Sequence, residues 1–167
     1  MPNYTVRRAT IEDVDTLVSH RIRMFEDMGI MSMPGANAVR LEADFRAWLL
    51  ELLPAGTYVA WVVEATSPHG PAEIVAGGGA TLIPWPPGPF YPGNRLAFVY
   101  NVYTEPAHRG RGLARRVMEA IHEFCRAEGI GSVALNASTS GRPLYESLGY
   151  HITPSPMMFL SLTSGGV

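Results

Sequence analysis

The chain has 167 residues, of which 47% are hydrophobic, and its formal net charge is -2. This length and composition are sufficient for one domain with a substantial core, and we expect a single domain over residues 1–167. The small net charge gives no basic surface for nucleic acid, and no apolar stretch is long enough to span a membrane, so we expect neither partner.

The residue types that are rare or missing exclude several kinds of chemistry. All 13 basic residues are arginine, which excludes a P-loop lysine and Schiff-base chemistry. Cys125 has no second cysteine for a disulfide or a paired-cysteine metal site, and we predict a buried, unreactive thiol and no metal. Residues Met1–Arg8 lack the apolar core of a signal peptide, so we expect a cytoplasmic protein.

The first 53 residues are predicted to form a strand and two helices. Alternation over Tyr4–Arg8 indicates the strand, and Thr10 with Asp13 forms a capping-box pattern that starts the first helix. Apolar residues at three- and four-residue spacing predict helices over 11–28 and 38–53.

A hairpin and a long loop are predicted next. Strands over 58–64 and 74–83 are joined by a polar turn, which is typical of a hairpin. The run Gly77–Gly79 inside the second strand favours a bulge or the close approach of another backbone over ligand contact. Residues 84–95 are rich in proline and aromatic side chains, so we expect an ordered surface loop.

The second half of the chain is predicted to contain a strand–helix–strand unit. A strand over 96–104, an amphipathic helix over 113–127 and a strand over 132–136 indicate a parallel strand pair. A short helix over 142–148 and a final strand over Met157–Leu162 complete the prediction.

The glycine-rich segment Arg109–Ala114, with the sequence R-G-R-G-L-A, stands between a strand and a helix. Its glycines permit close approach of a ligand, and the following helix leaves its first N–H groups unpaired and partly positive. Such a helix start favours a pyrophosphate. A Rossmann dinucleotide site is disfavoured because Arg115 replaces the third glycine and the strand ending at Asn136 supplies no acidic residue.

Two segments resemble motifs of the GNAT acyltransferase superfamily. Val102–Ala114 is similar to its acetyl-CoA motif R-x-x-G-x-G/A, and Gly141–Tyr150 is similar to its later pattern L-Y-x-x-L-G followed by an aromatic residue. The order of elements from Tyr4 to Leu162 is similar as well. The resemblance implies an α/β (α+β) fold with a mixed, mostly antiparallel central sheet, splayed at its middle and flanked by helices on both faces, and acetyl-CoA as the cosubstrate.

The resemblance also implies roles for individual residues. Backbone groups of a strand would bind the pantetheine arm, the Val102 N–H would polarise the thioester carbonyl, and Tyr145 would protonate the departing thiolate. This chain has Ser138 where relatives often have asparagine, so either Ser138 or Asn136 is expected to reach the cofactor. The expected cofactor-binding residues are Val102, Tyr103, Thr104, Arg109, Gly110, Arg111, Gly112, Leu113, Ala114, Arg115, Asn136 and Ser138.

Several assignments stay open at this point. Contact with phosphate is open for the side chains of four arginines, Arg109, Arg111, Arg115 and Arg116. For Arg115 and Arg116 the alternative is that they only solvate the helix. His108 is expected to pack beside the glycine loop rather than to act as an acid or base. The general base is either a water chain or one of six residues, namely Glu26, Glu64, Glu105, Asn101, Tyr103 and His151.

The resemblance implies an enzyme, an acetyl-CoA-dependent N-acyltransferase that transfers acetyl to an amine of a small molecule or peptide in a ternary complex. The alternative is a non-catalytic CoA-binding sensor or structural module, against which the retained Tyr145 argues. A toxin-like enzyme acting on charged tRNA is disfavoured by the absence of a basic surface. Family members often form dimers, so a homodimer is a further expectation.

An acceptor pocket is expected to be lined by Trp85–Tyr91 together with Phe25, Met28, Met31 and Met33. The alternative is that these residues only pack within their loops.

Overall fold

The computed structural model describes residues 2–30, 35–67, 70–89, 91–154, 157–160 and 162. Its internal contacts divide the chain into two compact units, Met1–Asn136 and Ala137–Val167. The sheet and the larger helices belong to the first unit.

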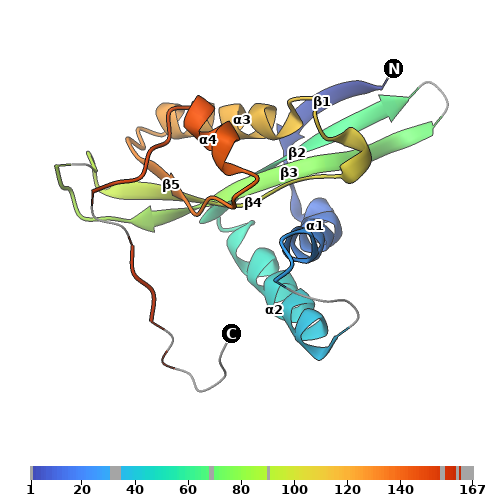
Figure 1. The fold of residues 1–167 in the computed structure, drawn as a ribbon, viewed down its shortest axis with the longest axis horizontal. Coiled ribbons are helices and arrows are strands. Elements are labelled where there is room, and N and C mark those ends of the chain that lie inside the picture. Colours follow the sequence, from blue (N-terminus) through green and yellow to red (C-terminus); the bar gives the residue numbers. More distant parts are fainter. Residues whose placement is uncertain are drawn as a thin grey trace. The chain divides into compact units, whose positions relative to one another are not determined.

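A five-stranded sheet in the order β1-β2-β3-β4-β5 lies at the centre of the first unit (Figure 1). Neighbours from β1 to β4 pair antiparallel, and β5 pairs parallel with β4, as predicted from the strand–helix–strand pattern. The mixed, mostly antiparallel sheet confirms the predicted fold class. The strands are β1 (Asn3–Arg8), β2 (Tyr58–Ser67), β3 (Gly70–Pro84), β4 (Arg95–Thr104) and β5 (Val133–Leu135).

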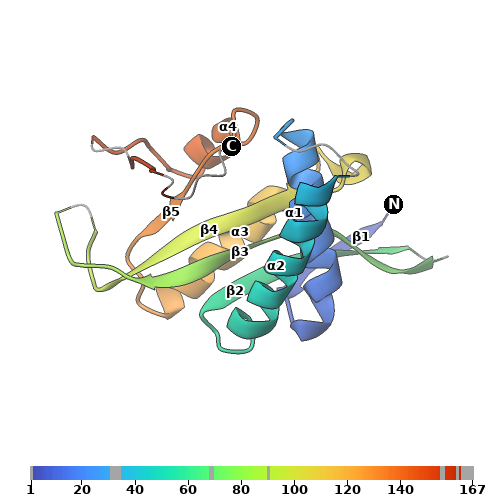
Figure 2. The same cartoon turned by 90° about the horizontal axis from the view of Figure 1, so that it is seen from below.

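Helices cover both faces of this sheet. The helices α1 (Val14–Asp27) and α2 (Ala36–Leu52) lie on one face, and α3 (Leu113–Ala127) lies on the other (Figures 1 and 2). All three confirm predicted helices, with α1 preceded by the 3-10 turn η1 (Ile11–Asp13). None of the helices within the described ranges is both long and apolar enough to cross a membrane.

The predicted cap at Thr10 is present and is joined to β1 by an ion pair. The Thr10 backbone N–H donates to Asp13 Oδ2 at 2.7 Å, while the Thr10 hydroxyl accepts from the Glu12 N–H at 3.3 Å. Arg7 donates to both carboxylate oxygens of Asp13, each at 2.8 Å. The bidentate guanidinium holds the pKa of Asp13 below its usual range. This cluster fixes where α1 leaves the sheet.

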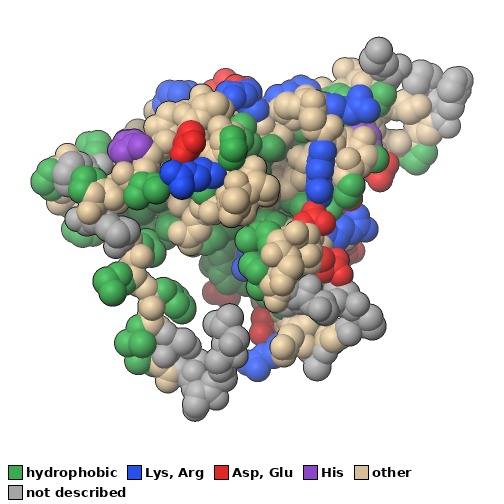
Figure 3. Space-filling view, viewed as in Figure 1, with side chains coloured by type: hydrophobic (Ala, Val, Ile, Leu, Met, Phe, Trp, Pro, Cys, Tyr) green, Lys and Arg blue, Asp and Glu red, His purple; other side chains and the backbone are tan. Residues whose placement is uncertain are grey.

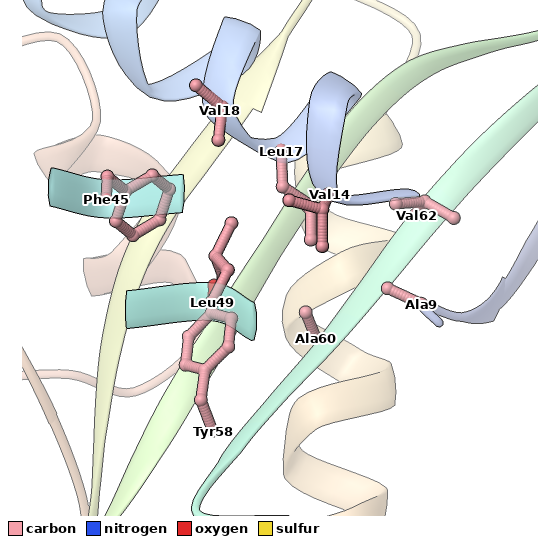
Figure 4. Packing of buried hydrophobic residues seen from close by; sticks show 9 residues of the cluster. All are labelled: Ala9, Val14, Leu17, Val18, Phe45, Leu49, Tyr58, Ala60 and Val62. Carbon is pink, nitrogen blue, oxygen red and sulfur yellow. The ribbon is translucent and has the colours of Figure 1, made fainter. Parts of the chain in front are cut away.

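The apolar stripes of α1 and α2 meet β2 in one buried cluster (Figure 4). Leu49 is fully buried, and the Trp48 ring lies 4.9 Å from that of Tyr58. Each buried aliphatic or aromatic side chain contributes roughly 1.5–3 kcal/mol to folding, so this cluster holds both helices on the sheet. The cluster consists of Ala9, Val14, Leu17, Val18, Phe45, Leu49, Tyr58, Ala60 and Val62.

The glycines at 77–79 are explained by close packing inside the sheet. The register between β3 and β4 shifts between Gly77 and Gly79, which confirms the predicted bulge. A Cβ atom on Gly78 would lie 3.1 Å from Val117 of α3, and one on Gly79 would lie 2.6 Å from the Val59 carbonyl oxygen. Only glycine fits at position 79.

We expect Gly79→Ala to lower the free energy of unfolding by about 2 to 3 kcal/mol, because the added methyl group overlaps the Val59 carbonyl and the Tyr58 ring. Urea denaturation checks this value. Gly70→Ala, in the same strand, is the matched control, because a Cβ there meets no atom within 4 Å. Equal stability of the two variants would contradict the packing explanation.

The described residues of the second unit form one predicted helix and do not form the predicted final strand. The helix α4 (Arg142–Ser147) ends near Gly149, whose φ is 93°. The prediction of a strand over Met157–Leu162 is wrong for its described residues 157–160 and 162, none of which lies in a strand. Met158 and Phe159 are 93% and 91% exposed. Apolar and aromatic composition favours a strand only where a neighbouring strand supplies hydrogen bonds and packing.

Candidate active site

The strand β4 has one edge that is only partly paired. Its residues Ala97–Val99 pair with β5, and no described residue of β5 pairs with β4 beyond Val99. On the other edge, Gly79 pairs with Tyr100 and Gly77 with Tyr103, so Asn101 and Val102 share the bulge. Asn101 has a φ of 59°, in the left-handed region. The sheet therefore separates beside Val102–Thr104, the segment predicted to bind pantetheine.

The glycine loop and the start of α3 present a group of backbone donors. The N–H groups of residues 110–114 have no hydrogen-bond partner among the described residues, and the first helical hydrogen bond runs from the Arg116 N–H to the Gly112 carbonyl at 3.1 Å. Gly110 and Gly112 both have a φ of 73°, and a Cβ on either would meet no atom within 4 Å. Unpaired donors and open space beside both glycines therefore occur together at the positive end of a helix.

The arginines around this loop have different environments. Arg109 donates to the Thr104 carbonyl at 2.9 Å and to Asp27, and Arg116 donates to the Tyr4 carbonyl at 2.9 Å. Both side chains therefore fasten the loop and helix to neighbouring elements. Arg111 is exposed, and Arg115 is half-buried on the first turn of α3. Of the predicted phosphate ligands, Arg111 is the side chain best placed to turn toward a ligand.

Glu105 and Tyr103, two candidates for the general base, belong to one cluster. Glu105 accepts from Arg23 and from the Tyr103 hydroxyl, the latter at 3.4 Å. The His20 ring lies 5.0 Å from the Tyr103 ring, and its Nε2 lies 3.6 Å from Glu105 Oε1. Burial raises the pKa of Tyr103, so its phenol stays protonated near neutral pH. An ion-paired carboxylate and a neutral phenol are poor bases at this position.

His20 makes the stability of the fold depend on pH. The residue is 2% exposed, and burial lowers its pKa to about 4, against about 6.5 in an unfolded chain. The unfolded state therefore binds more protons between pH 6.5 and 4, and stability falls as the pH falls through that window. We expect a loss of roughly 2 kcal/mol from pH 7.5 to pH 5. Urea denaturation at both pH values measures it, and His20→Leu should remove most of this dependence. An unchanged pH dependence in the variant would contradict the assignment.

The other candidate bases lie in different surroundings. Glu64 pairs with Arg7 at 2.7 Å on β2, Glu26 is exposed on α1, and His151 is exposed in the second unit. Asn101 alone among the six lines the cavity described below. The structure does not bring the six together.

His108 and Cys125 both have structural environments, as predicted. His108, in the 3-10 turn η2 (Pro106–His108), bonds through Nδ1 to the Tyr4 hydroxyl at 2.9 Å. Cys125 is 2% exposed on the inner side of α3, and burial raises the pKa of its thiol. The described residues contain no group of three His, Cys, Asp or Glu side chains that could hold a metal ion.

The second unit contains Ser138 and Tyr145. The Ser138 hydroxyl accepts from the Gly141 N–H at 3.1 Å, which caps the turn before α4. Tyr145 makes an edge contact with Tyr150, with ring centroids 5.9 Å apart, and burial raises the pKa of its phenol. Its hydroxyl therefore remains a proton donor across the neutral range. Asn136 is exposed immediately after β5, at the end of the first unit.

A cavity of about 340 Å³ lies between α1, α2 and β4 in the first unit. We call it the α1–α2–β4 cavity. Its lining combines aromatic rings with a cation, an anion and an amide, contributed by Arg21, Leu41, Asp44, Phe45, Trp48, Tyr100 and Asn101. It adjoins the bulge of β4, because Asn101 belongs to both.

These features agree with the comparisons to known proteins. A model of the acetyltransferase (GNAT) family matches residues 22–150. The chain belongs to the GNAT family. A GCN5-related N-acetyltransferase from Ralstonia eutropha JMP134 is 28% identical, with a TM-score of 0.81 over 95% of this chain and 99% of the other. A predicted acetyltransferase with acetyl-CoA from Clostridium acetobutylicum is 26% identical, with a TM-score of 0.80 over 96% and 97%.

A curated relative matches over a shorter stretch. The glucosamine 6-phosphate N-acetyltransferase of Trypanosoma brucei brucei is 31% identical over 58 residues, which are 35% of this chain and 40% of that protein's length. The chain thus belongs to a family of acetyltransferases that uses acetyl-CoA, and one of the solved structures it resembles is described with acetyl-CoA.

Sequence reasoning missed most of the α1–α2–β4 cavity of this GNAT protein. Phe25 contacts Arg21 rather than lining the cavity, and Trp85 packs against Tyr91 in the loop after β3. Met31 and Met33 lie outside the described residues. The one available signal was Arg21, a cation within the otherwise apolar spacing of the first helix.

Proposed function

We propose that this GNAT protein is one catalytic domain over residues 1–167 that transfers an acetyl group from acetyl-CoA to an amine by direct attack in a ternary complex. The observation that carries the proposal is the set of unpaired N–H groups at 110–114, next to the partly unpaired edge of β4. A diphosphate needs clustered donors, and the polyamide pantetheine arm needs a strand edge. CoA contains both groups in one molecule.

In the proposed reaction the neutral amine attacks the thioester carbonyl carbon. The carbonyl oxygen gains negative charge, which the Val102 N–H at the bulge would stabilise. The carbon–sulfur bond then breaks, and the Tyr145 hydroxyl gives its proton to the departing thiolate of CoA. The raised pKa of Tyr145 supports this role, because the phenol is uncharged and protonated at neutral pH.

The proton leaving the attacking nitrogen needs a separate acceptor. The ion pair of Glu105 with Arg23 and the pairing of Glu64 with Arg7 weaken the case for either carboxylate. We therefore favour a water chain as the acceptor of this proton, which is one of the alternatives that the sequence left open for the general base. Loss of that proton to water completes the amide, and a proton returned from water restores the Tyr145 phenol, so the products are the acetylated amine and CoA.

The proposed acceptor is an amine of a small molecule or peptide. The name of the Trypanosoma relative gives glucosamine 6-phosphate as its acceptor, but the matched stretch covers only 35% of this chain. That aminosugar is therefore one member of a test panel and not an assignment.

The test is thiol release from acetyl-CoA with a panel of amines, followed by mass spectrometry of the amine. We expect amine-dependent release and one acetyl group added to the product for at least one amine. Tight CoA binding with no thiol release for any amine would contradict the proposal and favour a CoA-binding sensor.

A further inference from the structure

Arg21 is a partly buried cation that lines the α1–α2–β4 cavity without a carboxylate partner. Its guanidinium carbon lies 4.9 Å from the Phe25 ring centroid and 4.7 Å from that of Phe45. No Asp or Glu among the described residues lies within salt-bridge distance of it. The charge is therefore held between aromatic rings and not by an ion pair.

The hydrogen bonds of Arg21 leave donor capacity unused. Its Nη1 donates to Asn101 Oδ1, and its Nε is buried without an acceptor. Its Nη2 makes no hydrogen bond to a described residue and is not among the buried unpaired atoms. The Asn101 Nδ2 is also buried without an acceptor. The Arg21 Nη2 is therefore the donor left for a ligand, and the guanidinium brings a positive charge to this side of the cavity.

The other charged residue of the cavity does not neutralise Arg21. Asp44 has a side chain that is 70% exposed and lies 3.5 Å from Arg40, one turn earlier on α2. Its charge is screened by water and shared with that arginine. The pairs of Arg46 with Asp15 and Glu42 join side chains that are 37% to 84% exposed, and acidic and basic side chains are interspersed around these helices in the space-filling view (Figure 3). Arg21 is the unneutralised charge facing the cavity.

Burying a cation without a counter-charge is costly, and a bound anion removes that cost. The planar guanidinium also matches the paired oxygens of a carboxylate or phosphate group. The rings of Trp48 and Tyr100 offer apolar walls in the same cavity, next to the β4 bulge. A ligand that satisfies all these groups has an anionic oxygen group and an apolar or flat body.

We propose that the α1–α2–β4 cavity binds the acceptor amine, and that this acceptor carries a carboxylate or phosphate group that pairs with Arg21. The assignment rests on the proposed function, since it places the acceptor of that reaction. It predicts selection against purely cationic amines, because these would bring a second positive charge to Arg21. Arg21 is then a specificity-determining residue.

The test uses two matched pairs of amines. Phenylalanine and 2-phenylethylamine share the ring and the amine and differ by the carboxylate. Glucosamine 6-phosphate and glucosamine differ by the phosphate. For each amine, kcat/KM is measured by thiol release, and Kd is measured by calorimetric titration into the full chain saturated with CoA. The two pairs distinguish a carboxylate acceptor from a phosphate acceptor.

We expect the wild type to prefer the anionic member of at least one pair by roughly 10-fold or more, in both kcat/KM and Kd. Arg21→Met should lose that preference while still binding CoA, and Arg21→Lys should recover part of it. Arg46→Met, which removes an arginine of α2 outside the cavity, is the matched control and should keep the preference. The test does not depend on the correct folding of one variant, because the preference for the anionic amine is also measured in the wild type with both pairs.

The inference is overturned if the wild type prefers neither anionic member, or if the preference survives in Arg21→Met. Thiol release only with 2-phenylethylamine or glucosamine, which have no anionic group, would overturn it while supporting the proposed acetyl transfer. Arg21-dependent binding of an anionic amine without thiol release would support the inference and contradict the acetyl transfer.

Discussion

Replacement of Gly112 by glutamate is expected to weaken CoA binding by at least about 100-fold. A Cβ at this position points into space where no protein atom lies within 4 Å, beside the unpaired N–H groups of 110–114. A carboxylate there would occupy the diphosphate position, and two like charges about 4 Å apart repel by roughly 4 kcal/mol near a protein surface. Calorimetric titration with CoA measures the loss.

Gly129→Glu is the matched control for this prediction. Gly129 follows the other end of α3, has a φ of 67° and also meets no atom within 4 Å of an added Cβ. Both substitutions place a side chain in the left-handed region, at a cost to folding of about 1 kcal/mol each. We expect both variants to lose a similar amount of folding stability and only Gly112→Glu to lose CoA binding. That result would show that the glutamate excludes the ligand, and that backbone strain is not the cause. Wild-type CoA affinity in Gly112→Glu would contradict the assigned diphosphate site.

Tyr145→Phe is expected to lower kcat by about 100-fold or more while leaving the Kd for CoA unchanged. The substitution removes only the hydroxyl, which makes no hydrogen bond to a described residue, so packing against Tyr150 is preserved. Without a proton donor, the negative charge on the departing thiolate is not neutralised, and the activation barrier for breaking the carbon–sulfur bond rises. Steady-state thiol release at saturating acetyl-CoA and amine measures the effect.

Tyr150→Phe controls for the loss of a phenol in the same unit, and we expect its kcat to stay within about threefold of the wild type. The raised pKa of Tyr145 adds a further check, because the wild-type rate should not fall from loss of this proton below about pH 10. A Tyr145→Phe enzyme with wild-type kcat would remove tyrosine from the mechanism.

The parts of the fold that the sequence predicted are those encoded by local patterns. The helix α3 ends at the predicted residues because Leu113, Val117 and Ile121 form a narrow buried stripe after the glycine loop. The capping box at Thr10 was visible from the spacing of Thr10 and Asp13. Likewise, three consecutive glycines in an apolar strand indicated the bulge in β3.

The parts that could not be predicted depend on contacts between distant residues. Arg21 and Asn101 are 80 positions apart, and their hydrogen bond exists only because α1 packs across β4. The cation at position 21 stands out within an apolar spacing, but no local pattern indicates that it shares a cavity with Asn101. Glu105 was a candidate base by position, and only the tertiary structure reveals that Arg23 pairs with it. The predicted strand at 157–162 failed for the same reason, since strand pairing is a tertiary property.

Hydrogen exchange of individual amides, with and without CoA, tests most directly how the ligand is bound. We expect CoA to slow exchange at 110–114 and at 102–104, and to leave exchange near Gly129, at the opposite end of α3, unaffected. Exchange unchanged at both segments, in a sample where titration shows CoA to be bound, would contradict this expectation.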